Sequence, residues 1–184
     1  QLLSPSLSVT RSPRSYNSQI GVPLSVWLLG EQSQVGVFEA GISQPGEMQA
    51  LRNIIQPTIG VFTCLGSAHQ ENFESMEQKC TEKLQLFRDA QTLIYPADDP
   101  IVSKCVEQMD FRGKLIPWHH TGKGAMEDNK EICRVVCRHL GMSEEVISER
   151  VARLEPVAMR LEVKSGRNGC TLINDSYNSD LGSL

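Results

Sequence analysis

Several common signatures are absent from this sequence of 184 residues, and each absence argues against a class of protein. No apolar run is long enough to cross a bilayer, and the opening residues are too polar for a signal peptide. There is no long basic run, and 18 basic against 22 acidic residues give a net charge of −4, so nucleic acid is not an expected partner. The 6 cysteines form no Cys-x-x-Cys pair and do not cluster with histidine, which argues against a zinc site and a disulfide framework. The sequence therefore predicts a cytoplasmic protein with reduced thiols.

A phosphate-binding loop of the GxxxxGK[ST] type is also absent. What the sequence does contain is a regular alternation of β-type and helical patterns, with 40% hydrophobic and 22% charged residues, which is typical of a globular protein. This alternation predicts an α/β fold with a mostly parallel sheet and helices on both faces. The expected strands are residues 34–38, 58–65, 92–95 and 114–118, and the first two are expected to be buried. A helix is expected to begin at Gly21, with an apolar stripe of Leu24, Trp27 and Leu28.

The pattern changes after Pro156. Two β-type runs, 159–164 and 169–174, are joined by a short segment rich in turn residues, which predicts a hairpin. A hairpin after a series of strand–helix units predicts two domains: a partial α/β domain over residues 1–156 and the start of a second α/β domain over residues 157–184.

Polar side chains follow two of the expected strands. Glu39 stands directly after the strand at 34–38, and His69 belongs to a polar cluster after the strand at 58–65. In open α/β sheets, ligands bind at the carboxyl ends of the strands. Two oxygen or nitrogen ligands from neighbouring strand ends would suit Mg²⁺, which takes few protein ligands and keeps several waters.

Lys83 has an unusual place in the helix that follows. The apolar stripe of this helix consists of Phe73, Met76, Cys80, Leu84 and Phe87. Lys83 lies within about 20° of Met76 on the helical wheel, because the two are seven residues apart. A lysine beside a core stripe either extends its ammonium to water or is held against a specific partner, and the spacing leaves both readings open.

Six short segments, in this order, resemble the motifs of the Mur ligases, the ATP-dependent amide-forming enzymes of peptidoglycan synthesis. They are Tyr16–Pro23 (YNSQIGVP), Glu39–Gly41 (EAG), Ser67–Phe73 (SAHQENF), Asp98–Pro100 (DDP), Met159–Glu162 (MRLE) and Asn174–Asn178 (NDSYN). The IGVP, AHxExF and DSYN signatures together are most similar to the branch that adds D-alanyl-D-alanine to UDP-N-acetylmuramoyl-tripeptide. The resemblance implies that these two molecules are the substrates, that ATP and Mg²⁺ are required, and that an acyl phosphate is the intermediate. In some bacteria this ligase is fused to an alanine racemase, and the residues leave such a fusion open.

The resemblance also implies a role for three residues in catalysis and metal binding. Glu39 matches a glutamate that binds Mg²⁺ near the ATP phosphates, and His69 matches a histidine beside a second Mg²⁺. Lys83 matches a lysine that reacts with CO₂ to form a carbamate, which supports a metal ion. A desolvated position would favour the neutral amine that this reaction needs.

Four further residues match binding positions of the family. Asn129 matches an asparagine that contacts adenine, Arg160 an arginine that reaches the nucleotide phosphates, and Asp175 an acid on the ribose. Asn17 lies in the loop that resembles the contact with the UDP-muramoyl substrate.

The sequence departs from the family in ways that bear on activity. The family's GTNGKT loop and first strand would lie before Gln1, so we expect this chain to be an inactive fragment of a longer ligase. Ser179-Asp180-Leu181 stands where the family often has Ala-Asn-Pro. Two alternatives remain: another ligase of the Mur or folylpolyglutamate type, or a non-catalytic nucleotide-binding module.

Overall fold

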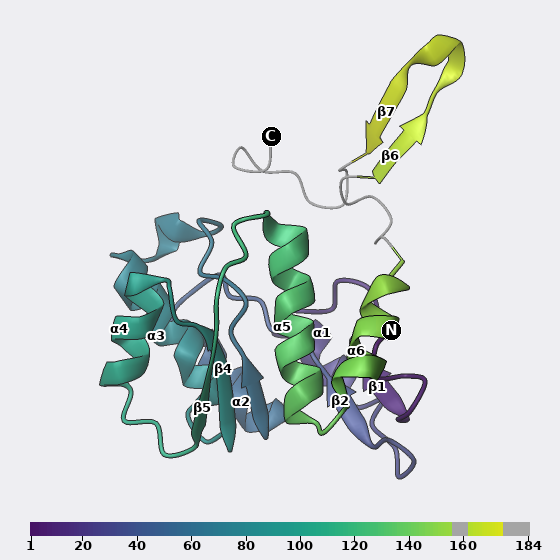
Figure 1. Ribbon diagram of the computed structural model, residues 1–184. Helices are drawn as coiled ribbons and strands as arrows, with labels where there is room; N and C mark the ends of the chain where they lie inside the picture. Colours follow the sequence, from purple (N-terminus) through teal and green to yellow (C-terminus); the bar gives the residue numbers. More distant parts are fainter. Residues whose placement is uncertain (156–161, 175–184) are drawn as a thin grey trace.

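The computed structural model describes residues 1–155 and 162–174, in which strands and helices alternate along the chain (Figure 1). The strands are β1 (Val9–Arg11), β2 (Val35–Val37), β3 (Ile59–Val61), β4 (Thr92–Pro96), β5 (Lys114–Trp118), β6 (Glu162–Ser165) and β7 (Thr171–Asn174). The α-helices are α1 (Gly21–Val26), α2 (Glu47–Ile55), α3 (Met76–Leu84), α4 (Pro100–Gln108), α5 (Ala125–His139) and α6 (Glu144–Ala152). Short 3₁₀ turns are η1 (Gln70–Asn72), η2 (Gln85–Phe87) and η3 (Arg167–Gly169).

The first five strands form parallel sheets, which confirms the predicted α/β class. β1 pairs with β2, and β3, β4 and β5 form a separate sheet in that order. The expectation of a buried strand at 34–38 is wrong, because β2 is half-buried at Val35 and exposed at Gly36 and Val37. β2 pairs with one described strand, whereas β4 lies between two neighbours and is buried along almost its whole length.

The three-stranded sheet is covered on both faces, because successive residues of its central strand point to opposite sides. Leu93 of β4 packs in a cluster that includes residues of α2, α3 and α4. Ile94, the next residue, packs with Trp118 of β5 and Ile132 of α5. Figure 1 accordingly shows α3 and α4 on one side of β4 and β5, and α5 on the other.

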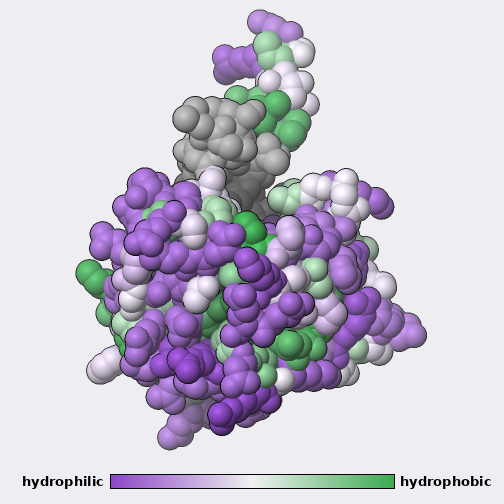
Figure 2. Space-filling model, turned by 90° about the vertical axis from the view of Figure 1, so that its left-hand side faces the viewer, coloured by the Kyte–Doolittle hydropathy of each residue, from purple (hydrophilic) through white to green (hydrophobic). Residues whose placement is uncertain are grey.

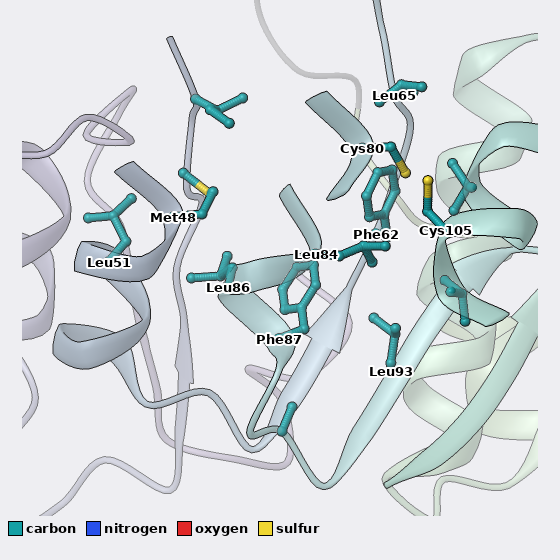
Figure 3. Close-up of a cluster of buried hydrophobic side chains, with 14 of the residues drawn as sticks. Met48, Leu51, Phe62, Leu65, Cys80, Leu84, Leu86, Phe87, Leu93 and Cys105 are labelled. Carbon is teal, nitrogen blue, oxygen red and sulfur yellow. The ribbon is translucent and has the colours of Figure 1, made fainter. Parts of the chain in front are cut away.

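The larger cluster fixes α3 against the sheet. In Figure 3, Phe62, Leu84 and Phe87 lie between Met48 of α2 and Cys105 of α4. Cys80 is fully buried in this cluster, and Cys137 is buried in a second one between α5 and α6. Both are free thiols that pack as small hydrophobic side chains.

The predicted apolar stripe of the first helix is wrong. Trp27, just after α1, is 87% exposed, and Leu24 and Leu28 are also exposed. The buried residues of α1 are Gly21, Val22 and Ser25, and the Ser25 hydroxyl donates to the Gly21 carbonyl at 2.8 Å. Gly21 allows a close approach, since a Cβ there would lie 2.8 Å from the backbone of Tyr16.

The hairpin is confirmed over the residues that the structure describes. β6 and β7 pair antiparallel from Glu162↔Asn174 to Ser165↔Thr171. The connection adopts left-handed backbone at Asn168 and Gly169, with φ of 56° and 76°. These residues are the type that such turns favour.

The surface and helix lengths agree with the composition. The face in Figure 2 is largely hydrophilic, with hydrophobic patches that are small and separate. Within residues 1–155 and 162–174, no helix has both the length and the apolar character that a bilayer span requires.

We expect Gly60→Ala in β3 to destabilise the fold by about 1–3 kcal/mol, because overpacking a tight core forces neighbours to move. A Cβ at this position would lie 2.5 Å from Cδ1 of Phe87. Gly30→Ala is the matched control, since nothing lies within 4 Å of a Cβ there. Urea unfolding of both variants measures the difference, and an equal midpoint for the two would contradict the packing described here.

Candidate functional site

The loops after β1 and β2 meet at the carboxyl edge of their sheet. Asn17 Nδ2 donates to Glu39 Oε1 at 2.9 Å, and the Gly41 amide donates to the Asn17 carbonyl at 2.7 Å. Gly41 permits this contact, because a Cβ there would lie 3.2 Å from the Asn17 side chain. The structure therefore brings Asn17 and Glu39 together, and it leaves the Glu39 side chain at the surface.

The loop after β3, an edge strand of the three-stranded sheet, carries His69. His69 has left-handed backbone, with φ of 59°, and its side chain is 54% exposed. The turn that it opens, η1, is joined to the loop after β2, because Asn72 Nδ2 donates to the Ser43 carbonyl at 2.8 Å. Glu47 in turn accepts hydrogen bonds from the amides of Ser43 and Gln44. Burial raises the Glu47 pKa, but these bonds outweigh it and hold that pKa below its usual value.

Lys83 is held against a specific partner, which resolves the two readings of its position. Its ammonium donates to the carbonyls of Cys64 and Leu65 at 3.0 and 2.9 Å, and it lies 5.5 Å from the centre of the Phe62 ring. Burial lowers the Lys83 pKa, and the neighbouring Lys79 ammonium adds to the effect. Both effects favour the neutral amine over the ammonium.

A second lysine of α3, which sequence reasoning missed, supports the same loop. Lys79 is only 1% exposed, and its ammonium donates to the carbonyls of Gly66, at 2.9 Å, and Ala68. Burial lowers its pKa, with Glu71 acting in the opposite direction. The available signal was its spacing of four residues from Lys83, which places both on one helical face.

The three predicted metal-binding residues fit Mg²⁺ only in part. Glu39 offers a carboxylate and His69 an exposed imidazole, and both are donors that a divalent cation can use. Lys83 as an ammonium has no lone pair to donate and is occupied by carbonyls. Among the described residues, no three His, Cys, Asp or Glu side chains come together as a metal site.

A second polar cluster lies at the carboxyl end of β5. His120 Nδ1 lies 2.8 Å from Asp128 Oδ2, and the His120 amide donates to Asp98 at 2.8 Å. The hydrogen bond to the Asp128 carboxylate raises the His120 pKa, and the hydrogen bonds that Asp128 accepts from His120 and Thr121 lower the Asp128 pKa to about 2. Asn129, the predicted adenine contact, follows Asp128 directly and is exposed. Sequence spacing missed this cluster because its members come from three separate segments.

Two predicted nucleotide contacts, Arg160 and Asp175, lie outside the described residues. Asp99 caps the start of α4, since its side chain accepts hydrogen bonds from the amides of Ile101 and Val102.

Comparison with known families and sequences gives a consistent result. Residues 2–130 match the family model of the Mur ligase middle domain. A UDP-N-acetylmuramoyl-tripeptide–D-alanyl-D-alanine ligase of Bacillus subtilis is 24% identical over 96% of this chain and 45% of its own length. The corresponding ligase of Treponema pallidum is 33% identical over 43% of this chain and 17% of its own length. The chain thus spans less than half the length of these relatives.

Solved structures show the same fold. A crystal structure of MurF from Acinetobacter baumannii superposes with a TM-score of 0.87 at 20% identity, covering 99% of this chain and 48% of that one. MurF ligase from Thermotoga maritima, solved in complex with ADP, gives 0.82 at 23% identity, covering 99% of this chain and 50% of that one.

The His120–Asp128 pair predicts a pH dependence of stability. The pKa of His120 is raised in the folded protein. The stabilisation by the pair is therefore complete below the ordinary histidine pKa of about 6.5 and is lost as the pH rises through the folded-state pKa of His120. His120→Gln should therefore lower the melting temperature more at about pH 5.5 than at about pH 8. His119→Gln is the control, and the measurement is thermal unfolding at both pH values. An equal effect of His120→Gln at both would refute the ion pair.

Proposed function

Because this chain belongs to the Mur ligase middle-domain family, we propose that it is the central, ATP-binding part of a longer amide ligase that adds D-alanyl-D-alanine to UDP-N-acetylmuramoyl-tripeptide. The names of the relatives support this substrate pair, and the ADP complex of the Thermotoga maritima ligase supports use of a nucleotide. In this proposal residues 1–156 form part of the central domain, and residues 157–184 begin the next one.

The observation that carries the proposal is the convergence of three loops at one edge of the fold. Asn17 contacts Glu39, Asn72 contacts the loop that follows Glu39, and Lys83 lies beneath the loop that carries His69. Asn17, Glu39 and His69 follow the ends of the successive strands β1, β2 and β3, and strand ends of this kind are where α/β proteins bind ligands.

The proposed reaction has two steps. An oxygen of the tripeptide's terminal carboxylate forms a bond to the γ-phosphorus of ATP, and the bond from that phosphorus to the β-phosphate oxygen breaks, so ADP leaves. The dipeptide amine then attacks the acyl carbon of the acyl phosphate, the bond from that carbon to the phosphate oxygen breaks, and the amine loses a proton. Since no side chain forms a covalent intermediate, the protein's main tasks are positioning and neutralising charge.

Each site residue has a defined task in this scheme. Glu39, oriented by Asn17, would supply a carboxylate to hold Mg²⁺, and His69 would supply an imidazole for a second ion. When bound, Mg²⁺ neutralises charge on the phosphates. Neutral Lys83 reacts with CO₂ by forming a bond from Nζ to carbon and releasing a proton, which turns a cation into an anion that can support the metal. Burial of Lys83 favours the amine that this reaction needs.

Nucleotide binding is assigned to residues outside this group. Asn129 is exposed at the start of α5, where it can contact adenine. Arg160 is proposed to reach the phosphates and Asp175 the ribose. Asn17 is proposed to contact the UDP-muramoyl substrate in addition to its hydrogen bond to Glu39.

The test is phosphate release by the longer protein that contains this chain, given ATP, Mg²⁺ and UDP-N-acetylmuramoyl-tripeptide. We expect release to require D-alanyl-D-alanine. Release that requires a different amino acid would keep the family and change the substrate, and no release under any pairing would refute the proposal.

Within that assay, Glu39→Gln should reduce kcat by about 100-fold or more, because it removes a charge that meets the transferring phosphoryl group. Glu31→Gln is the matched control, since Glu31 is exposed in the connection between α1 and β2. A Glu39→Gln enzyme within twofold of the wild-type rate would contradict the assignment.

A further inference from the structure

Lys79 is the most deeply buried charged side chain of the described residues, and the proposed reaction gives it no task. Only 1% of the residue is exposed, and no carboxylate lies within ion-pair distance in the described ranges. Its partners are the main-chain carbonyls of Gly66 and Ala68, with the Phe73 ring 6.0 Å away. Burial of an ammonium destabilises the folded protein unless the ammonium donates hydrogen bonds. The hydrogen bonds to these two carbonyls therefore compensate for the burial of Lys79.

The loop that Lys79 contacts is held by packing at Leu65, which is buried in the main hydrophobic cluster, and by hydrogen bonds to its carbonyls. Every carbonyl from Cys64 to Ala68 accepts a hydrogen bond: two from Lys83, two from Lys79 and one, at Ser67, from the Gln70 amide. Gly66 and His69 have positive φ, of 61° and 59°. Left-handed backbone at a residue other than glycine costs about 1 kcal/mol or more, so its surroundings must hold it there.

The two lysines hold different parts of this loop. Lys83 binds the carbonyls nearest to β3, whereas Lys79 binds the carbonyl of Ala68, the residue directly before His69. The turn that follows is tied through Asn72 to Ser43, in the loop after Glu39. Lys79 therefore contacts the backbone directly before His69, and Asn72, in the turn after His69, contacts the neighbouring loop.

We propose that Lys79 is a positioning residue of the ligase site, whose buried ammonium holds the Gly66–Ala68 backbone so that His69 stays at the carboxyl edge of the sheet. The proposal rests on the proposed function for its effect on catalysis. If Lys83 becomes a carbamate, it loses the ammonium that donates to the carbonyls of Cys64 and Leu65. The hydrogen bonds from Lys79 to Gly66 and Ala68 are then the lysine contacts that still hold the loop.

The first test uses the longer protein with Lys79→Met, which keeps the apolar stem and removes the donors. We expect kcat to fall about 10- to 100-fold, since a displacement of about 1 Å can cost that much. The Mg²⁺ concentration for half-maximal rate should rise severalfold, while KM for D-alanyl-D-alanine stays within twofold. Lys104→Met is the matched control, because Lys104 is exposed on the neighbouring helix α4.

Hydrogen exchange gives a readout that does not need ligase activity. The amides of Asn72 and Phe73 donate to the carbonyls of His69 and Gln70, so they report on the turn. In Lys79→Met these amides should exchange at least tenfold faster, while the amides of β4 keep their wild-type protection. If wild-type protein shows no ligase activity but this local change occurs, the proposed function fails and the positioning role stands.

Two results would overturn the proposal. One is a folded Lys79→Met protein with kcat and Mg²⁺ requirement within twofold of wild type. The other is a uniform loss of protection across the sheet, which would make Lys79 a stability residue. If Lys79→Met does not fold, Lys79→Gln keeps a side-chain donor, and the same two criteria apply to it. Adding n-propylamine to Lys79→Ala should restore activity, and tetramethylammonium, which has no N–H donor, should not.

Discussion

The site depends on an unusual interaction: two ammonium groups from one face of α3 are inserted under the backbone that leaves β3. Neither ammonium is paired with a carboxylate of residues 1–155 or 162–174, and both donate to carbonyls of the same loop. Cys80 and Leu84 hold α3 in the main hydrophobic cluster, so the loop that the lysines contact is attached to a rigid part of the core. The hydrogen bond from Asn72 to Ser43 connects this loop to the loop after β2. Packing in the core thus determines how the polar groups at the surface are arranged.

Sequence patterns predicted the fold class well, but they predicted the burial of β2 and of the first helix incorrectly. Alternating βα units identified a parallel architecture, since β4 and β5 carry strong apolar runs and Asp99 with Pro100 signals the start of α4. The first helix was misread because periodicity assumes that large apolar residues face the core. In α1 the buried residues are Gly21, Val22 and Ser25, so only Val22 gives a hydrophobic signal on the interior side.

The site was predictable where a single residue broke its local pattern. Lys83 stood out against an apolar stripe, and the structure shows it held by carbonyls. Lys79 gave no such contrast, because it lies in a polar stretch of sequence, and its burial depends on how the β3 loop folds over the helix. The contacts of His120 with Asp128 and of Asn17 with Glu39 join separate segments, so only tertiary structure could reveal them.

The unequal pairing of the strands divides the site into parts that open with different ease. Asn17 and Glu39 follow β1 and β2, which pair over Val9↔Val35 to Arg11↔Val37, whereas His69 follows β3, whose partner β4 is mostly buried and is also paired with β5. Short, exposed ladders open at lower free energy than buried ones, so the first pair is the earliest point of attack for a protease. A molecule that bound both Glu39 and His69 would therefore raise the free energy needed to open the β1–β2 sheet, because it would connect that sheet to the more stable one.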